Sequence, residues 1–291
     1  MTLPLKCIDI SKKFEKTLAL NHINLELKDN KFYGLLGANG AGKTTLLKII
    51  ANQLFPSEGV VEIFGQSFEE DESRVKDICY VRESNYYWKD LSVNKLISMA
   101  KVSYDKWDHQ LEKKLREKFK IKNKTLEKLS KGQEAAVNIL IGLCSNAKIT
   151  LFDEAYVGLD APSRAYFFQL LRESFEKNPR VIILSTHFIE EIEGLLEEII
   201  LINEGNLVVH EEKDKILENA YSIIGKGEEA YKIIKGKNIL KEEKMGRFSV
   251  IHLFDKITNE EINQLRTAGL DVNTMSLQNW FIHMINNNDE E

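Results

Sequence analysis

The chain of 291 residues has few cysteines, and no two of them lie near each other in the sequence. Cys7, Cys79 and Cys144 form no Cys-x-x-Cys pair. Disulfide frameworks and structural zinc sites need cysteines at close, paired spacings. The sequence therefore predicts neither kind of site, and this cysteine usage fits a reducing cytosol.

Long apolar runs are also missing from the sequence. No window approaches the ~20 apolar residues that a helix needs to cross a bilayer. The first residues, 1–9, hold no apolar stretch long enough for a secretory signal. If the protein serves a membrane process, we therefore expect another chain to supply the membrane part.

Long basic runs, which are typical of nucleic-acid-binding proteins, are absent as well. The formal net charge is -5 and the sequence pI is about 5.8. The densest basic stretch, residues 113–124, is interrupted by Glu117 and preceded by Glu112. It is either a solvated helix face or a contact for an acidic partner or anionic lipid headgroups. We expect no nucleic-acid partner.

What is present is an alternation of strand and helix patterns. Short apolar strands are predicted at residues 3–10, 20–27, 32–36, 60–64, 78–81, 149–152 and 181–184. A helical pattern covers about residues 85–145, and Pro162 opens a further helix. Such alternation predicts an α/β fold with a mostly parallel sheet and helices on its faces.

After about residue 213 the pattern changes. Strands are predicted at 221–224, 238–243, 248–254 and 272–275, and helices at 228–234 and 258–268. This β-α-β-β-α-β order matches the ferredoxin-like α+β arrangement. We therefore expect two domains, residues 1–212 with a helical subdomain at about 85–145, and residues 213–291. A last helix at 277–285 has an apolar face that must bury against its own domain or a second chain.

The strongest chemical signal lies at residues 37–44, which match G-x-x-x-x-G-K-[ST] at every position. Such glycines let backbone N–H groups cradle phosphate oxygens, and the helix that follows adds its positive end. Lys43 is expected to reach the β- and γ-phosphates, and the Thr44 hydroxyl to bind Mg²⁺. The predicted ATP-binding residues of this loop are Gly37, Ala38, Asn39, Gly40, Ala41, Gly42, Lys43, Thr44 and Thr45.

A second motif, residues 149–154, is an apolar strand that ends in two carboxylates. Asp153 at the strand end can hold Mg²⁺ through water. Glu154 can orient and polarise the water that attacks the γ-phosphate. Two acids after a strand are often only a loop start, so their meaning depends on the motifs around them.

Three further motifs identify the family. Residues 129–133, Leu-Ser-Lys-Gly-Gln, resemble the LSGGQ sequence of ABC ATPases. Residues 158–160, Gly-Leu-Asp, are similar to the D-loop of that family, and His187 is similar to its switch histidine. Because the motifs also follow the family's order, residues 3–212 are identified as an ABC ATPase with a P-loop NTPase core.

The resemblance implies a head-to-tail dimer in which each ATP lies between the P-loop of one chain and residues 129–133 of the other. Glu154 would be the general base and His187 would contact the γ-phosphate, unless His187 is structural. Phe14 would stack on adenine, or else belong to the core. The residues implied to contact the partner's nucleotide are Ser130, Gly132, Gln133 and Asp160.

Two positions depart from the family pattern. Arg82 and Glu83 stand where Pro-Gln is usual. A carboxylate can still bind Mg²⁺ or its water, so Glu83 joins Thr44 and Asp153 as a predicted metal-binding residue. Glu83 is also a predicted catalytic residue. Lys131 replaces a glycine of LSGGQ, and its side chain could face the partner's phosphates or point to solvent. Since no catalytic group is lost, we expect an active, homodimeric ATPase.

These departures resemble the ATPase subunits of ABC-2 type exporters of Gram-positive bacteria, which export peptides, antibiotics or lipids or confer resistance to them. The resemblance implies a peripheral protein at the cytoplasmic face of the membrane, joined to an integral membrane permease. Residues 86–88, Tyr-Tyr-Trp, would anchor that subunit or pack the helical subdomain. The alternative is a soluble ABC ATPase that acts as a regulator or assembly factor. Residues 213–291 would serve dimer contact or regulation.

Overall fold

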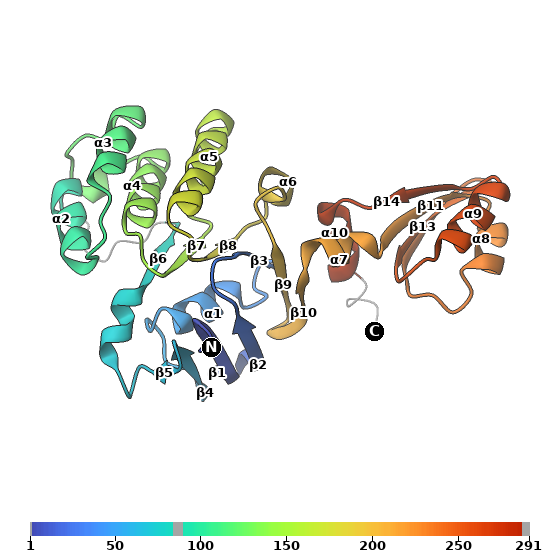
Figure 1. The fold of residues 1–291 in the computed structure, drawn as a ribbon, viewed down its shortest axis with the longest axis horizontal. Helices are drawn as coiled ribbons and strands as arrows, with labels where there is room; N and C mark the ends of the chain where they lie inside the picture. Colours follow the sequence, from blue (N-terminus) through green and yellow to red (C-terminus); the bar gives the residue numbers. More distant parts are fainter. Residues whose placement is uncertain (1, 84–89, 287–291) are drawn as a thin grey trace. The chain divides into compact units, whose positions relative to one another are not determined.

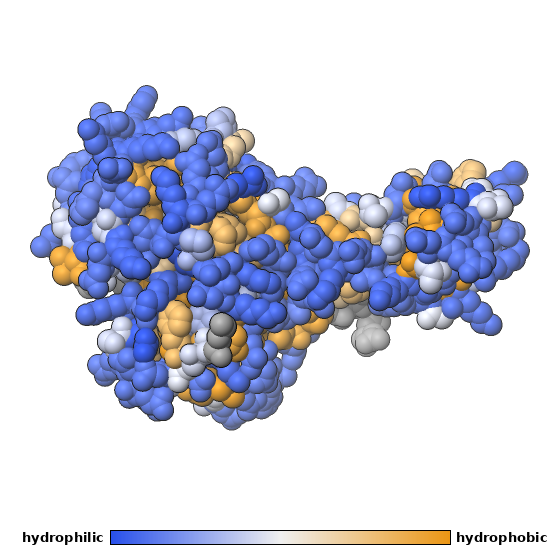
Figure 2. All heavy atoms as spheres, in the orientation of Figure 1, coloured by the Kyte–Doolittle hydropathy of each residue, from blue (hydrophilic) through white to orange (hydrophobic). Residues whose placement is uncertain are grey.

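The computed structural model describes residues 2–83 and 90–286, and the chain divides into two compact units, residues 1–210 and 211–291. The predicted aromatic cluster at residues 86–88 lies outside the described residues. On the face drawn in Figure 2 the surface is mostly hydrophilic, with apolar atoms in separate groups. Within the described residues, no helix is long and apolar enough to cross a membrane.

The first unit contains two sheets that share one core with the helix α1 (Lys43–Ile50), which lies between them (Figure 1). One sheet has the strand order β2-β1-β4-β5 and the other the order β10-β9-β3-β8-β7-β6. The strands are β1 (Leu5–Phe14), β2 (Thr17–Leu27), β3 (Phe32–Leu36), β4 (Glu58–Ile63), β5 (Gln66–Ser67), β6 (Ile78–Arg82), β7 (Ile149–Asp153), β8 (Val181–Ser185), β9 (Glu198–Asn203) and β10 (Asn206–Glu212).

The strands β9, β3, β8, β7 and β6 pair in parallel, as the alternating pattern predicts. The residues of β3, β7, β8 and β9 are all buried, which suits parallel strands covered on both faces. Parallel pairing brings the carboxyl ends of the strands to one edge of the sheet. Ligands of such sheets bind at this edge, where the loops after β3, β6, β7 and β8 carry the predicted site residues.

The predicted helical stretch contains three helices that lie side by side with a fourth, α5 (Figure 1). The other helices of this unit are α2 (Val93–Ser103), α3 (His109–Lys118), α4 (Lys131–Cys144), α5 (Ala161–Lys177) and α6 (Ile189–Ile192), with short 3₁₀ turns η1 (Glu72–Asp77) and η2 (Leu126–Lys128). Side-chain caps begin the longer helices at Ser92, Asp108, Ser130 and Asp160, because each cap satisfies a free backbone N–H group.

The second unit confirms the predicted β-α-β-β-α-β order and adds a short helix before it. Its elements are α7 (Lys213–Glu218), β11 (Ala220–Gly225), α8 (Gly227–Ile233), β12 (Ile239–Met245), β13 (Phe248–Phe254), α9 (Asn259–Thr267), β14 (Asp271–Thr274) and α10 (Leu277–Asn286). The sheet has the order β12-β13-β11-β14, and its pairs are antiparallel. Residues Ile251 and Leu253 join the core with α8 and α9.

The last helix, α10, packs within its own unit. Trp280 lies 5.7 Å from Phe254 between ring centroids, and His283 stacks on His252 at 3.9 Å. Successive strand residues point to opposite faces, so α10 covers the face of β13 that α8 and α9 leave open. Of the two alternatives left open by the sequence for the apolar face of this helix, the structure shows burial against its own domain.

Candidate functional site

The phosphate-binding loop fills the turn between β3 and α1, and its glycines are required by the backbone. A Cβ atom at Gly37 would lie 2.3 Å from the carbonyl oxygen of Ile202. Gly42 has φ 109°, and a Cβ atom there would lie 2.7 Å from the carbonyl oxygen of Ala19. Only glycine fits both positions, because any side chain would collide with backbone or strain it.

Lys43, the first residue of α1, turns back over this loop. Its side-chain nitrogen donates hydrogen bonds of 2.6 Å and 2.9 Å to the carbonyl oxygens of Gly37 and Ala38. Burial lowers the pKa of Lys43, while the charges of Glu154 and Asp153 act in the opposite direction. The loop therefore holds a buried ammonium group where the sequence predicts a phosphate contact.

A pocket of about 390 Å³ opens beside the loop. It is lined by Ala19, Asn39, Gly40, Ala41, Gly42, Lys43, Thr44, Thr45, Lys48, Arg82, Glu83, Asp153 and Glu154. The structure thus brings most of the predicted loop residues together with the three predicted carboxylates. Ala19, Lys48 and Arg82 were not among the predicted site residues. Lys48 lies one helical turn beyond Thr44, so helical spacing could have identified it.

Asp153 ends β7 and is almost fully buried, with 5% of its surface exposed. The hydroxyl of Tyr80 donates a 2.9 Å hydrogen bond to its Oδ2 atom, and the backbone N–H of Glu83 donates to its carbonyl oxygen at 3.0 Å. Burial and the charge of Asp153 raise the pKa of Tyr80, which keeps the phenol a donor. The carboxylates of Asp153 and Glu83, together with the Thr44 hydroxyl, offer the oxygen atoms that Mg²⁺ prefers.

Glu154 is the first residue after β7, and its position is set by an unusual backbone conformation and one backbone hydrogen bond. It has φ 51°, and its N–H donates to the carbonyl oxygen of Ser185 at 3.2 Å. A non-glycine residue in this left-handed conformation costs about 1–3 kcal/mol and is common at functional sites. Its Oε2 atom lies 2.9 Å from Nδ1 of His187. The structure therefore pairs the predicted base with the predicted switch histidine.

The predicted residues of the LSKGQ motif form a separate group. Ser130 caps α4, and its backbone and side chain exchange hydrogen bonds of 3.3 Å with Gln133. A Cβ atom at Gly132 would lie 3.0 Å from the carbonyl oxygen of Gly158, so α4 begins in close contact with the D-loop. Asp160 caps α5 by accepting from the Ser163 N–H at 2.9 Å. None of these predicted residues lines the pocket described above.

Phe14 lies at the end of β1 and is 45% exposed. The Nζ atom of Lys12 is 5.2 Å from the centre of its ring. An exposed ring can stack on a base, whereas a core phenylalanine would be buried. The core alternative for Phe14 is therefore wrong, although Phe14 is not one of the residues that line the pocket.

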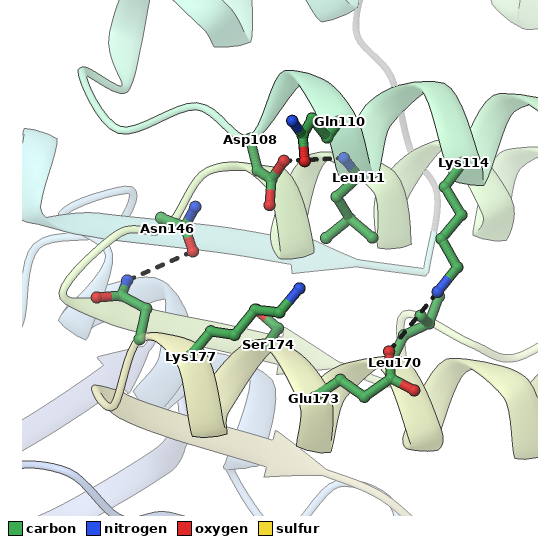
Figure 3. A pocket seen from close by; sticks show the side chains of 10 residues that line it. Asp108, Gln110, Leu111, Lys114, Asn146, Leu170, Glu173, Ser174 and Lys177 are labelled. Carbon is green, nitrogen blue, oxygen red and sulfur yellow. Dashed lines mark hydrogen bonds and ion pairs between the residues drawn. The ribbon is translucent and has the colours of Figure 1, made fainter.

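A second hollow, of about 230 Å³, lies between α3 and α5 (Figure 3). Lys114 points across it to Glu173 at 3.6 Å, and Asp108 caps α3 through the Leu111 N–H. These side chains form an ion pair with each other or cap a helix. The hollow contains none of the predicted site residues, so it is not part of the candidate site.

The chain is similar to known ATP-binding proteins of transporters. The ABC transporter family matches residues 20–157. The probable sulfate/thiosulfate import ATP-binding protein CysA of Chlorella vulgaris is 31% identical over 69% of this chain and 87% of its own length. The bacitracin transport ATP-binding protein BcrA of Enterococcus faecalis is 30% identical, over 69% of this chain and 66% of its own.

Among solved structures, the chain is similar to an ATP-binding subunit of an ABC transporter, with a TM-score of 0.65 and 22% identity. That match covers 74% of this chain and 92% of the other, and at this identity it shows the fold alone. The phosphate loop, the two adjoining carboxylates and the paired histidine thus occur in the fold that the motifs predict. The chain belongs to the ABC transporter family as one of its ATP-binding, ATP-hydrolysing proteins.

Proposed function

We propose that the chain is the ATP-hydrolysing subunit of an ABC exporter and powers export of a peptide, antimicrobial or lipid-like substrate. A separate integral membrane permease carries the substrate, and this chain works at the cytoplasmic face of the membrane. The observation that carries the proposal is the meeting of Lys43, Asp153 and the Glu154–His187 pair at one edge of the sheet. BcrA is named for bacitracin transport and CysA for import, so both relatives support a transport role, and the export direction is our proposal.

The predicted residues at this edge of the sheet have distinct roles in the reaction. The loop N–H groups and Lys43 bind the phosphates, and Thr44, Glu83 and Asp153 would hold Mg²⁺, which would neutralise negative charge on the phosphates. Glu154 accepts a proton from the attacking water. His187 holds the Glu154 carboxylate at 2.9 Å and so restricts where that water can sit.

The dimer completes the site. The LSKGQ motif and Asp160 lie apart from the chain's own pocket, and Ser130 and Gln133 are held in the cap of α4. A preformed α4 N-terminus offers N–H groups and a positive field to an anion. We propose that this surface meets the nucleotide bound by a second copy of the chain, head to tail, so that ATP binding favours the closed dimer.

The replacement of Glu154 with Gln tests the ATPase. The amide keeps the shape of the carboxylate but cannot accept the proton, so hydrolysis should fall about 10²- to 10⁴-fold while ATP binding persists. Phosphate release and binding of a fluorescent ATP analogue measure the two effects. Glu173→Gln is the matched control, because Glu173 is an exposed carboxylate on α5 paired with Lys114 outside the pocket. Unchanged hydrolysis by Glu154→Gln would contradict the assignment.

Purification of the chain from detergent extracts of its own cells tests the transport role. We expect a polytopic membrane protein to co-purify with it and to raise its ATPase rate. Purification with no membrane protein would favour the alternative, a soluble ABC ATPase that acts as a regulator or assembly factor.

A further inference from the structure

The two positions that depart from the family pattern contact each other. Lys131 begins α4 and Glu83 follows β6, and the Lys131 Nζ atom lies 3.6 Å from the Glu83 Oε1 atom. The sequence left two orientations open for Lys131, toward a partner's phosphates or toward solvent. In the structure the side chain is 81% exposed to solvent, and its end lies beside a carboxylate of its own chain.

The charge of Lys131 is unfavourable by itself. The N-terminus of a helix carries partial positive charge, so a lysine in the first turn of α4 is repelled by it. Glu83 lies in a pocket that holds both signs of charge, with Asp153 and Glu154 on one side of the balance and Lys43, Lys48 and Arg82 on the other. The Glu83 carboxylate beside Lys131 therefore offsets the repulsion between the lysine and the helix end.

The backbones of the two residues are firmly held. The Glu83 N–H is bonded to the carbonyl oxygen of Asp153, and Gly132 packs closely on Gly158. Asn138, two turns along α4, donates a 2.8 Å hydrogen bond to the carbonyl oxygen of Arg82. Both side chains are exposed, 81% for Lys131 and 45% for Glu83, so they can change orientation without moving these backbone contacts.

We propose that Lys131 is a positioning residue for Glu83 and that the two separate when Mg-ATP binds. Glu83 then turns to the Mg²⁺ site, and Lys131 is released to the phosphates bound by the partner chain. This inference rests on the proposed function. The exchange means that Mg-ATP in one pocket releases an unpaired positive charge on the surface that closes the partner's pocket.

The strength of the pair suits an exchange. Exposed ion pairs change an equilibrium constant by about two- to fivefold, and salt screens them. A buried pair would be harder to separate. We therefore expect a small effect that depends on Mg²⁺ and on ionic strength, rather than a loss of folding.

A double-mutant cycle of Lys131→Met and Glu83→Gln tests the exchange. The quantity measured is the Mg²⁺ concentration that half-saturates binding of a fluorescent ATP analogue. Lys131→Met should lower it about two- to fivefold at low ionic strength, because Glu83 no longer has to leave a cation. The same substitution in the Glu83→Gln background should have no effect, and high salt should remove the difference.

Two controls isolate the side-chain pair. Lys131→Arg should keep the wild-type Mg²⁺ dependence. Lys128→Met removes an exposed lysine just before α4 and should change nothing. An equal shift with and without Glu83, or no shift in either background, would overturn the exchange. If wild-type chain fails to bind the analogue with Mg²⁺ at all, the proposed function itself is wrong, so the two failures are distinguishable.

Discussion

We expect the hydroxyl group of Tyr80 to affect both the stability of the first unit and its binding of Mg²⁺. It donates to the buried carboxylate of Asp153 at 2.9 Å. Hydrogen bonds to charged groups stabilise by about 1.5–3 kcal/mol. Tyr80→Phe keeps the ring against the core but leaves one carboxylate oxygen without this donor. We therefore expect the free energy of unfolding of the first unit to fall by about that amount.

The same change should weaken Mg²⁺ binding. Residues that orient a metal ligand typically contribute 10- to 100-fold in metal affinity. The Mg²⁺ concentration that half-saturates ATP hydrolysis should accordingly rise about tenfold or more in Tyr80→Phe. Urea unfolding followed by circular dichroism measures the first effect, and phosphate release at varied Mg²⁺ measures the second.

Tyr104→Phe is a suitable control. The Tyr104 hydroxyl donates a 3.2 Å hydrogen bond to the backbone oxygen of Ile78, which lies on β6 as Tyr80 does. Its loss should cost about 0.5–1.5 kcal/mol in stability, with Mg²⁺ dependence unchanged. If Tyr80→Phe lowers stability but leaves the Mg²⁺ dependence at the wild-type value, Tyr80 is merely structural and the reasoning fails.

Two more predictions concern other parts of the chain. Gly132→Ala places a methyl group 3.0 Å from a D-loop carbonyl oxygen. Overpacking costs about 1–3 kcal/mol and alanine in α4 gains about 1 kcal/mol, so the free energy of unfolding should fall by up to ~2 kcal/mol in urea titrations. Burial lowers the pKa of His252 and His283, with Lys241 acting the same way and Glu243 opposing. Protonation then favours the unfolded chain, so stability of the second unit should fall below about pH 6.5, by up to ~1.4 kcal/mol per pH unit for each histidine. A pH-independent melting temperature between pH 7 and 5 would contradict this.

Much of the fold follows from local pattern. Buried apolar runs such as β7 and β8, set between helices, imply parallel pairing, and the order of elements in the second unit predicts its sheet. The strands β9 and β10 were not among the predicted strands. A short apolar run such as that in β9 cannot be distinguished from a buried helix segment by periodicity alone. The six-residue α7 is too short to show a helical period.

The candidate site was predictable where chemistry fixes residue types at fixed spacing. That holds for the phosphate loop, Asp153, Glu154 and His187, which the structure places around one pocket or in contact with it. It does not hold for Tyr80, because a tyrosine in a strand usually signals only β-propensity. Nor does it hold for Lys131, whose contact with Glu83 joins segments far apart in the chain and depends on the tertiary fold.

The position of Lys43 affects how ATP is bound. Moving an ammonium group out of water is unfavourable, and here the fold has already done so, with only 8% of the residue exposed and two loop carbonyl oxygens as acceptors. Phosphate oxygens entering the pocket can take the place of those acceptors without first desolvating the cation. Since the loop is also held in shape by its own lysine, binding need order little backbone. The phosphate-binding site is thus formed when the chain folds and does not have to be arranged when ATP arrives.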